Sequence, residues 1–371
     1  MFKLKSVLRF YKILLLTLIL LAVFDISADE RAKEFSLSPD PRGLPDITIC
    51  TQNLGLFGTF SDSEIRQPSL TKEEYKIKLN SLVERFMRAR CDIIAVQEVL
   101  GEKTEAFKAL LTLRERLRKK WNRFFNIVNG DGEYASRCAF LFAIDKVELL
   151  HSVTYQGVEL PKINPQDASR SFPRAPLEVQ LRTLSGIGAE KKILRLITFH
   201  FKSKRGGWKD PAQLEYETHR MVMAEALRRI ILSRHNGAVR KGTSPLILLG
   251  DRNSDEFSAS ARILEGSIHL GNFFNGKTCR IGGGGAPLCT PMARGPQDFF
   301  SVLTSDVETR SQGGTFLYKK KPVWLDDILL PAEALHYART RLDDSGNYDS
   351  GLLFEPKEAS DHALAYVKLN W

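Results

Sequence analysis

The chain has 371 residues, 43% of them hydrophobic, so it is long enough to bury a sizeable core in one large domain or two ordinary ones. Lysine and arginine number 54 against 44 aspartates and glutamates, which gives a formal net charge of +10. This balance bears on partners rather than on fold, and it favours anionic ligands such as nucleic acid, a phospholipid surface or a polyphosphate over cationic ones.

The N-terminus has the parts of a secretory signal peptide. The apolar stretch from Ile13 to Phe24, interrupted only by Thr17, has 12 residues. As a helix it would span ~18 Å, whereas a bilayer core needs ~20 residues. Basic residues precede it and small residues follow it, which favours cleavage near Ala28. An uncleaved anchor is the alternative. The basic residues are Lys3, Lys5, Arg9 and Lys12.

We therefore predict that residues 1–28 are a signal peptide, that residues 29–45 are a polar linker, and that residues 46–371 form one domain. The predicted location is secreted or periplasmic, as in a bacterium. After cleavage we expect a monomer with no stable membrane association.

Five cysteines follow. Cys50, Cys91 and Cys138 lie inside or beside apolar runs, and we predict buried thiols. Cys279 and Cys289 flank a glycine-rich segment and could close a small loop in an oxidising compartment; the sequence leaves this open. No CxxC or HxxxH spacing occurs, which argues against a zinc site.

Apolar runs and helical periodicities alternate along the chain, which predicts an α/β domain. A capping box at Thr71 opens a helix to about Arg90, a second helix covers about 103–120, and a third begins at Asp210-Pro211 and ends at Gly237. Strands are expected at 47–49, 93–96, 124–128, 138–143, 147–154, 177–181, 193–200, 246–249, 324–330 and 363–369.

Polar side chains gather at the ends of these strands. Asn53 and Glu98 follow or end two of them, and an amide oxygen with a carboxylate suits Mg²⁺. His200 ends another strand just before a basic loop that contains Lys202 and Lys204, a context that suits phosphate oxygens.

Further chemistry lies toward the C-terminus. In Gly250-Asp251-Arg252-Asn253 the aspartate could orient a water and Asn253 could hold a phosphate. Asp361 is a candidate metal ligand beside His362, a candidate base. Asp326 is placed to orient that imidazole, because a carboxylate that takes the imidazole proton fixes its tautomer and raises its basicity.

In this order the motifs resemble those of the endonuclease/exonuclease/phosphatase superfamily, from about Asp46 to Trp371. The resemblance implies a four-layer α/β sandwich of two face-packed mixed β-sheets flanked by helices. It implies Mg²⁺ or Mn²⁺ held by Glu98 with Asn53 and Asp361 nearby, and His362 as a general base oriented by Asp326. It further implies that His200, Asp251 and Asn253 bind the phosphate. Arg137 and Arg174 look like substrate-side positions.

Three residues depart from the family pattern. Arg252 stands where an apolar or aromatic residue is common, Leu364 stands where proline is common, and Ser136 lies near a position that is glutamate in some nucleases.

The stretch from Phe199 to Lys204 and the segment Thr315-Phe316-Leu317-Tyr318 resemble secreted bacterial nucleases of this superfamily. We therefore expect a metal-dependent nuclease whose partner is nucleic acid, DNA or RNA. The alternative is a phosphatase or phospholipase C-type enzyme acting on an inositol phosphate or sphingomyelin. A non-catalytic binding protein is a third possibility.

Overall fold

The computed structural model describes residues 47–60, 70–132, 136–164, 166–184, 191–204, 214, 216–241, 245–276, 278–338 and 348–369. They belong to a compact unit, Asp46–Trp371. The signal peptide and linker expected in residues 1–45 lie outside this description and stay predictions. No helix of the described segments is long and apolar enough to cross a membrane.

Two mixed six-stranded sheets form the domain. Sheet A has the strand order β15 (Ser350–Leu353), β16 (Leu364–Leu369), β1 (Ile47–Phe57), β2 (Ile93–Leu100), β4 (Ser136–Ala143) and β3 (Phe125–Asn129). Sheet B has the order β11 (Phe299–Ser301), β14 (Asp326–Pro331), β8 (Leu246–Asp251), β7 (Ile193–His200), β6 (Leu177–Thr183) and β5 (Val147–Thr154).

Each sheet has one parallel pair at its centre, and the other pairs that we observe are antiparallel. In sheet A, β1 and β2 are connected through α3 (Lys72–Arg88). In sheet B, β7 and β8 are connected through α5 (Glu217–Lys241). Because parallel strands point the same way, the carboxyl ends of each pair lie at one edge of their sheet, where ligands bind in many α/β folds.

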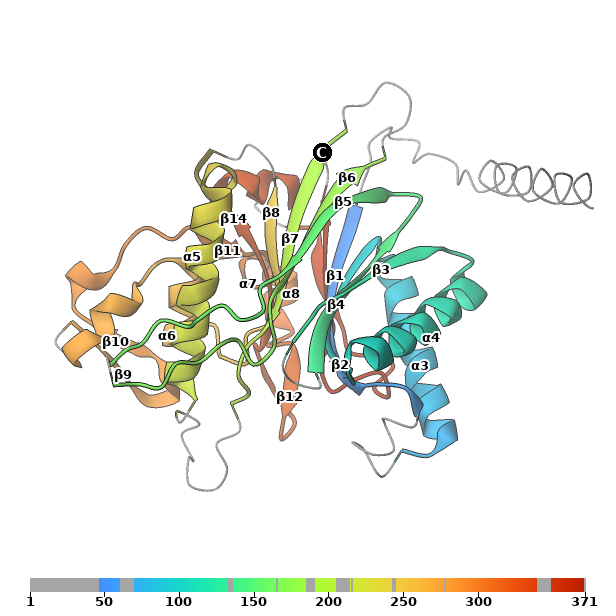
Figure 1. Ribbon diagram of the computed structural model, residues 1–371, viewed down its shortest axis with the longest axis horizontal. Helices are drawn as coiled ribbons and strands as arrows, with labels where there is room; N and C mark the ends of the chain where they lie inside the picture. The colour runs from blue at the N-terminus through green and yellow to red at the C-terminus, as the bar shows by residue number, and fades with distance from the viewer. Residues whose placement is uncertain are drawn as a thin grey trace, which may run out of the picture. The chain divides into compact units, whose positions relative to one another are not determined.

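Helices cover the outer faces of both sheets, as Figure 1 shows. α3 and α4 (Lys103–Trp121) pack on sheet A through a cluster that includes Leu82, Leu113 and Ile94. α5 and α6 (Ala259–Glu265) pack on sheet B through Leu227, Ile263 and Leu248. The four layers expected from the sequence are present.

The main core lies between the sheets, where side chains such as Ile49 and Phe140 from sheet A meet Leu196 and Ile247 from sheet B. Every residue in these four positions is at most 1% exposed. The two sheets therefore hold one another at a fixed spacing, which also fixes the edge where their central strands end.

Short elements that carry little periodicity complete the unit. They are α7 (Val302–Ser305), α8 (Val307–Ser311), the 3-10 helices η1 (Leu270–Gly276), η2 (Gly283–Gly285), η3 (Pro291–Ala293) and η4 (Ala332–Ala338), and two hairpins, β9 (Cys279–Ile281) with β10 (Pro287–Cys289) and β12 (Phe316–Tyr318) with β13 (Lys321–Val323).

The predicted end of the third helix was wrong. α5 passes through Gly237 and ends at Lys241, with a kink at His235 where φ is −130°. One glycine costs a helix only about 1 kcal/mol, which packing of α5 on sheet B outweighs. The start expected at Asp210-Pro211 lies outside the described residues.

The cysteine prediction needs one correction. Cys50 of β1 and Cys91, just before β2, form a disulfide rather than two thiols, with a Cα–Cα distance of 5.8 Å. Their strands are neighbours in sheet A, which brings two cysteines 41 residues apart within bridging range. Cys279 and Cys289 also form a disulfide, and Cys138 is a buried free thiol as predicted. Burial raises the pKa of that thiol to about 12.

Candidate active site

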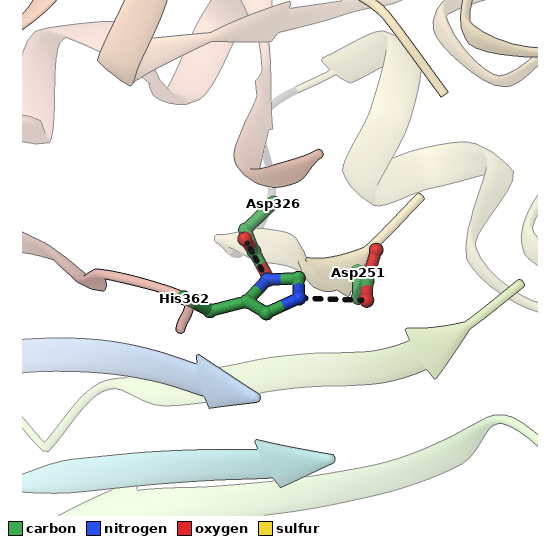
Figure 2. A group of neighbouring side chains, drawn as sticks. All are labelled: Asp251, Asp326 and His362. Atoms are coloured by element: carbon green, nitrogen blue, oxygen red, sulfur yellow. Dashed lines mark hydrogen bonds and ion pairs between the residues drawn. The ribbon is translucent and has the colours of Figure 1, made fainter. Parts of the chain in front are cut away.

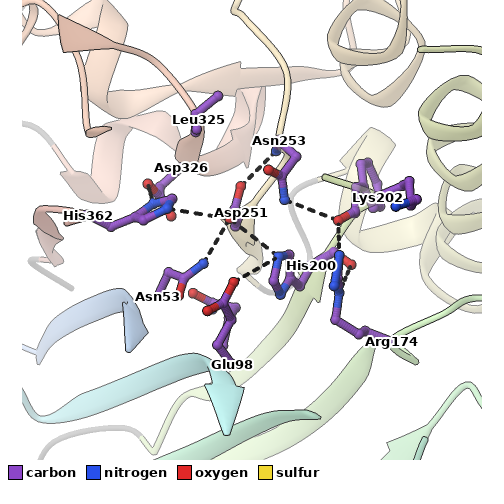
Figure 3. Close-up of polar contacts among 12 residues, drawn as sticks. Asn53, Glu98, Arg174, His200, Lys202, Asp251, Asn253, Leu325, Asp326 and His362 are labelled. Atoms are coloured by element: carbon purple, nitrogen blue, oxygen red, sulfur yellow. Dashed lines mark hydrogen bonds and ion pairs between the residues drawn. The ribbon is translucent and has the colours of Figure 1, made fainter. Parts of the chain in front are cut away.

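Four of the predicted residues lie where the central strands end. Asn53 is in β1, Glu98 in β2, His200 is the last residue of β7 and Asp251 the last of β8. His200 and Asp251 are register partners, and Asn53 pairs with Gln97, the neighbour of Glu98. Figure 3 shows their side chains converging from both sheets.

Two hydrogen bonds join the sheets beneath this rim. The amide Nδ2 of Asn53 donates to Oδ2 of Asp251 over 3.0 Å. One strand residue deeper, Nε2 of Gln97 donates to Oγ1 of Thr198 over 2.9 Å. Both groups are buried, so each bond is needed to satisfy its partners, and together they fix sheet A against sheet B.

The backbone at the rim is strained. Glu98 has φ 61° and Asn253 has φ 52°, in the left-handed region that side chains rarely adopt. Gly250 has φ 146°, and a Cβ there would lie 2.1 Å from the carbonyl oxygen of Phe199. The glycine therefore permits the close approach of β8 to β7 that aims Asp251 and Asn253 at the rim.

His362 and Asp326 form a buried pair, shown in Figure 2. Nδ1 of the imidazole lies 2.7 Å from Oδ2 of Asp326, and Nε2 lies 4.0 Å from Oδ2 of Asp251. Burial disfavours the imidazolium, but the carboxylates of Asp326, Asp251 and Asp361 outweigh burial and raise the pKa of His362 to about 10. This is the arrangement of a strong base with one nitrogen held by a carboxylate and the other directed to the rim.

Asp251 is the hub of the cluster. Its Oδ2 lies 3.5 Å from Nε2 of His200, and its Oδ1 accepts from the backbone N–H of Asn253 over 2.7 Å. Burial and the nearby Asp326 raise the pKa of Asp251 to about 7. Burial, together with Arg174 and His362, lowers the pKa of His200, which keeps that ring neutral.

The side chains of Asn253 and Arg174 share one hydrogen-bond acceptor. Nδ2 of Asn253 and Nη2 of Arg174 both donate to the carbonyl oxygen of Phe201, over 3.1 and 2.6 Å. Arg174 is close enough to Glu98 and Asp251 for both carboxylates to act on its charge, although burial dominates and lowers its pKa. The structure thus brings a fixed positive charge and an amide to the same side of the rim as His200.

Oxygen donors suited to a hard cation lie beside these groups. Oε1 of Glu98 lies 3.8 Å from His200, and Oε2 accepts from the N–H of Leu56 over 2.8 Å. Asp361 is exposed. Burial lowers the pKa of the Lys78 ammonium to about 8, while the carboxylates of Asp361 and Glu98 act to raise it. Both carboxylates are therefore close to the Lys78 ammonium. The donor set fits Mg²⁺ or Mn²⁺.

Asp251, Asp326 and His362 are also a possible metal-binding group, because one ligand atom from each lies within 4.8 Å of the others. Nδ1 of His362 is committed to Asp326, however, and Oδ2 of Asp251 accepts from Asn53. All three are buried, whereas Glu98 is 22% exposed. These contacts favour proton transfer at the trio and cation binding at Glu98.

The remaining predicted residues have other contacts. The guanidinium of Arg137, 3% exposed, donates to the carbonyl oxygens of Gly101 and Gly130 and pairs with Glu102, so it supports the loop after β2. The structure does not bring Arg137 to the cluster.

The two basic-loop lysines lie beyond His200. The ammonium of Lys202 lies 4.0 Å from the ring centroid of Tyr216, and that of Lys204 pairs with Asp255 at 2.6 Å. Their contact with phosphate stays a prediction.

Sequence reasoning missed Arg85, which holds the loop of Asp361 and His362. Arg85 is 1% exposed, and its guanidinium donates to the carbonyl oxygens of His362 over 2.6 Å and Ser360 over 3.1 Å, and to Oε1 of Gln52 over 3.1 Å. The available signal was an arginine on the apolar face of the α3 helix, in phase with Leu82 and Phe86.

The departure at Arg252 has a structural explanation. Its guanidinium, 1% exposed, lies 2.8 Å from Oδ2 of Asp327 and 3.7 Å from Oε1 of Glu265. Asp327 pairs in register with Gly250. The buried charges thus tie the segment of Asp251 and Asn253 to the strand that carries Asp326.

Solved structures similar to this one share its fold. The catalytic domain of human Nocturnin with bound sulfate gives a TM-score of 0.51 at 15% identity, over 88% of this chain and 94% of that chain. An endonuclease/exonuclease/phosphatase family protein from Bacteroides thetaiotaomicron gives 0.50 at 12% identity, over 88% and 98%. ANGEL2, described as a 2′,3′-cyclic phosphatase and bound to adenosine-2′,3′-vanadate, gives 0.50 at 13% identity, over 88% and 96%.

No family model matches the chain, and no curated protein matches its sequence. The chain therefore shares the fold of these proteins, and that fold is the one implied by the resemblance of the sequence motifs.

Proposed function

We propose that this protein is a metal-dependent phosphoric ester hydrolase, and specifically a nuclease that cleaves DNA, RNA or both. One observation carries the proposal: the His362–Asp326 pair, 2.7 Å apart, faces Asp251, which in turn contacts Asn53 and His200. A base, a proton carrier and neutral hydrogen-bond donors at one rim are what in-line attack of water on phosphorus requires.

In the proposed reaction the neutral imidazole of His362, which is the minority form below its pKa of about 10, takes a proton from water at Nε2 while the water oxygen forms a bond to phosphorus. Asp326 holds Nδ1 and stabilises the imidazolium. The bond from phosphorus to the departing oxygen breaks, and that oxygen takes up a proton, which Asp251 can supply because its pKa is raised to about 7. His200 and Asn253 bind the phosphoryl oxygens.

Glu98, with Asn53 and Asp361, would hold the divalent cation. A bound Mg²⁺ or Mn²⁺ would neutralise charge that develops on the phosphoryl oxygens. Arg174 would add a second positive charge beside the phosphoryl group. Its guanidinium is close enough to Glu98 and Asp251 to interact electrostatically with both carboxylates.

The nuclease assignment is supported by charge and by resemblance. Removal of residues 1–28 takes away four positive charges and one negative charge from the formal +10, and the remaining formal charge of +7 favours a phosphate backbone over a neutral substrate. The segments Phe199 to Lys204 and Thr315 to Tyr318 resemble secreted bacterial nucleases. Among the similar structures, ANGEL2 carries a nucleoside-type vanadate.

The second candidate is a phosphatase or phospholipase C-type enzyme. Two facts keep it as the alternative: ANGEL2 is described as a phosphatase on the same fold, and Pro322 with Trp324 and Asp326 is similar to a segment of inositol polyphosphate 5-phosphatases.

We also propose that the mature protein is secreted or periplasmic and monomeric. Two disulfides support an oxidising compartment, since such bonds are rare in reducing ones. N-terminal sequencing of the protein recovered from culture medium or periplasm tests this, with Asp29 expected as the first residue. Recovery of the protein only from the cytoplasm, with residue 1 intact, would contradict it.

The function is tested by incubating the purified protein with Mg²⁺ or Mn²⁺ and a substrate panel: plasmid, linear DNA, RNA, sphingomyelin and inositol phosphates, each with an EDTA control. Metal-dependent cleavage of a nucleic acid is the expected result. Turnover of a lipid or inositol phosphate alone would replace the nuclease assignment by the second candidate. A folded protein that turns over no phosphoester would refute the hydrolase proposal.

A further inference from the structure

The short β12–β13 hairpin begins next to the His362–Asp326 pair. Thr315, just before β12, is fully buried, and its Oγ1 accepts from the backbone N–H of Asp326 over 2.9 Å and of Leu325 over 3.1 Å. The carbonyl oxygen of Thr315 accepts from the N–H of Ala363 over 2.7 Å. One residue on, Phe316 pairs with His362 through its backbone and places its ring 4.7 Å from the imidazole.

Hydrogen bonds to Leu325, Asp326 and Ala363 therefore fix the root of the hairpin next to His362, the proposed general base. Gly314 reinforces this attachment, because a Cβ there would lie 2.5 Å from the backbone of Val323. The β12–β13 hairpin (Phe316–Val323) cannot shift at its root without disturbing His362 or Asp326. Figure 1 shows β12 extending away from the two sheets.

Beyond Phe316 the side chains turn outward. Leu317 is 45% exposed and Tyr318 is 46% exposed. The turn and the residue after it are Lys319, Lys320 and Lys321, all exposed. Among the described residues none of the three is in an ion pair; the Lys319 ammonium lies 5.5 Å from the Tyr318 ring centroid.

The turn sequence is unusual for its geometry. Lys319 and Lys320 have φ values of 48° and 67° between register partners Tyr318 and Lys321. A two-residue turn with both φ positive strongly prefers Asn-Gly or Asp-Gly. Lysine is therefore unfavourable at both turn positions, because a residue with a side chain is strained at positive φ. Backbone strain of this kind is often found at functional sites.

We infer that the β12–β13 hairpin is a binding arm for single-stranded nucleic acid, with its lysines on the phosphates and Tyr318 stacked on a base. This inference rests on the proposed function and names the strand state of its substrate. The lysines at the tip lie about 10 Å along the strand from Phe316. A strand cleaved at His362 would therefore continue along the hairpin and bring its next phosphates to these lysines.

The composition favours nucleic acid over a lipid surface. A membrane-inserting element presents a broad apolar face, whereas here the apex is Lys-Lys with one aromatic and one aliphatic side chain behind it. Stacking on an exposed tyrosine needs an unpaired base, which only a single strand or a frayed end offers.

The test combines binding and cleavage. In the His362→Ala background, the affinity for a fluorescein-labelled single-stranded oligonucleotide and for its duplex is measured by anisotropy at several salt concentrations. Lys319→Asn with Lys320→Gly removes two charges while giving the turn its preferred residues, so the fold is preserved or stabilised. We expect single-strand affinity to fall about ten-fold and the salt slope to flatten by about 1.4.

Matched variants separate charge at the hairpin from charge in general. Lys119→Ala with Lys120→Ala removes two exposed charges from the end of α4 and should change affinity less than two-fold. Tyr318→Phe keeps the stacking face and should bind like the parent, whereas Tyr318→Thr should bind about five- to a hundred-fold more weakly.

Cleavage of the oligonucleotide and hydrolysis of bis(4-nitrophenyl) phosphate are measured with the same hairpin substitutions in the enzyme that retains His362. If the hairpin substitutions lower activity on the oligonucleotide at least five-fold more than activity on this small diester, the binding arm is supported. Hairpin variants that bind single strands as tightly as the parent would overturn it, as would loss of binding to phosphatidylserine vesicles with no effect on oligonucleotides. Absence of all hydrolysis would refute the proposed function, while the anisotropy arm would still decide the hairpin.

Discussion

Nδ1 of His362 lies 2.7 Å from Oδ2 of Asp326, although the two residues are 36 positions apart and approach from different sheets. Asp326 opens β14 of sheet B, and His362 precedes β16 of sheet A. The pair is buried. The relative placement of the two sheets is therefore also the placement of the proposed base against its orienting carboxylate.

Asp326→Asn is expected to lower kcat by about 10²–10⁴-fold, because it removes the group that orients and strengthens the general base. The carboxylate of Asp326 raises the pKa of His362 against the effect of burial. Its loss should therefore move the acid limb of the pH–rate profile to lower pH. A variant with native circular dichroism and an unchanged profile would rule out the pairing as the source of basicity.

Glu98→Gln is expected to weaken Mg²⁺ or Mn²⁺ binding at least about ten-fold, since a carboxylate ligand is replaced by a neutral amide. Titration calorimetry on the protein without substrate measures this directly. Glu102→Gln is the matched control, because that carboxylate lies just beyond β2 and is 80% exposed. Equal metal affinity in both variants would place the cation elsewhere.

Arg252→Met is expected to lower the free energy of unfolding by about 3–5 kcal/mol, because it leaves the buried carboxylate of Asp327 without an opposite charge. The double variant Arg252→Met with Asp327→Leu should recover most of that loss. Urea denaturation measures both. Additive destabilisation in the double variant would show that the 2.8 Å contact does not couple the two residues.

Glu265 predicts a stability that depends on pH. Burial raises the pKa of its carboxyl from 4.5 to about 7. Its contribution is thus fully present below 4.5 and is lost as pH rises through 7, a change of roughly 3 kcal/mol. Glu265→Gln should flatten the fall in unfolding free energy between these pH values. A wild-type slope that survives the substitution would assign the effect to other groups.

Much of the fold could be predicted because its signals are local. The apolar run before Glu98 and the one before Asp251 read as strands, and the capping box at Thr71 marked the start of α3, where both of its hydrogen bonds occur. The kink of α5 at His235 had no comparable signal. Three-residue strands such as β9 and β12 are too short to show periodicity.

The site was predictable residue by residue but not as a network. His362, Asp326 and Asp251 could be named from strand ends and motif order, yet the contact of Asn53 with Asp251 exists only because the sheets face each other. Arg85 and the Cys50–Cys91 disulfide were missed for the same reason. Each joins segments whose proximity depends on tertiary packing.

The most direct test of the account compares metal-dependent cleavage of a labelled oligonucleotide by the wild type, His362→Ala and the control His269→Ala, whose histidine is exposed. We predict that His362→Ala lowers the cleavage rate by about 10²–10⁴-fold while His269→Ala matches the wild type, and that EDTA abolishes cleavage. A folded His362→Ala protein that cleaves at the wild-type rate would contradict the proposed mechanism.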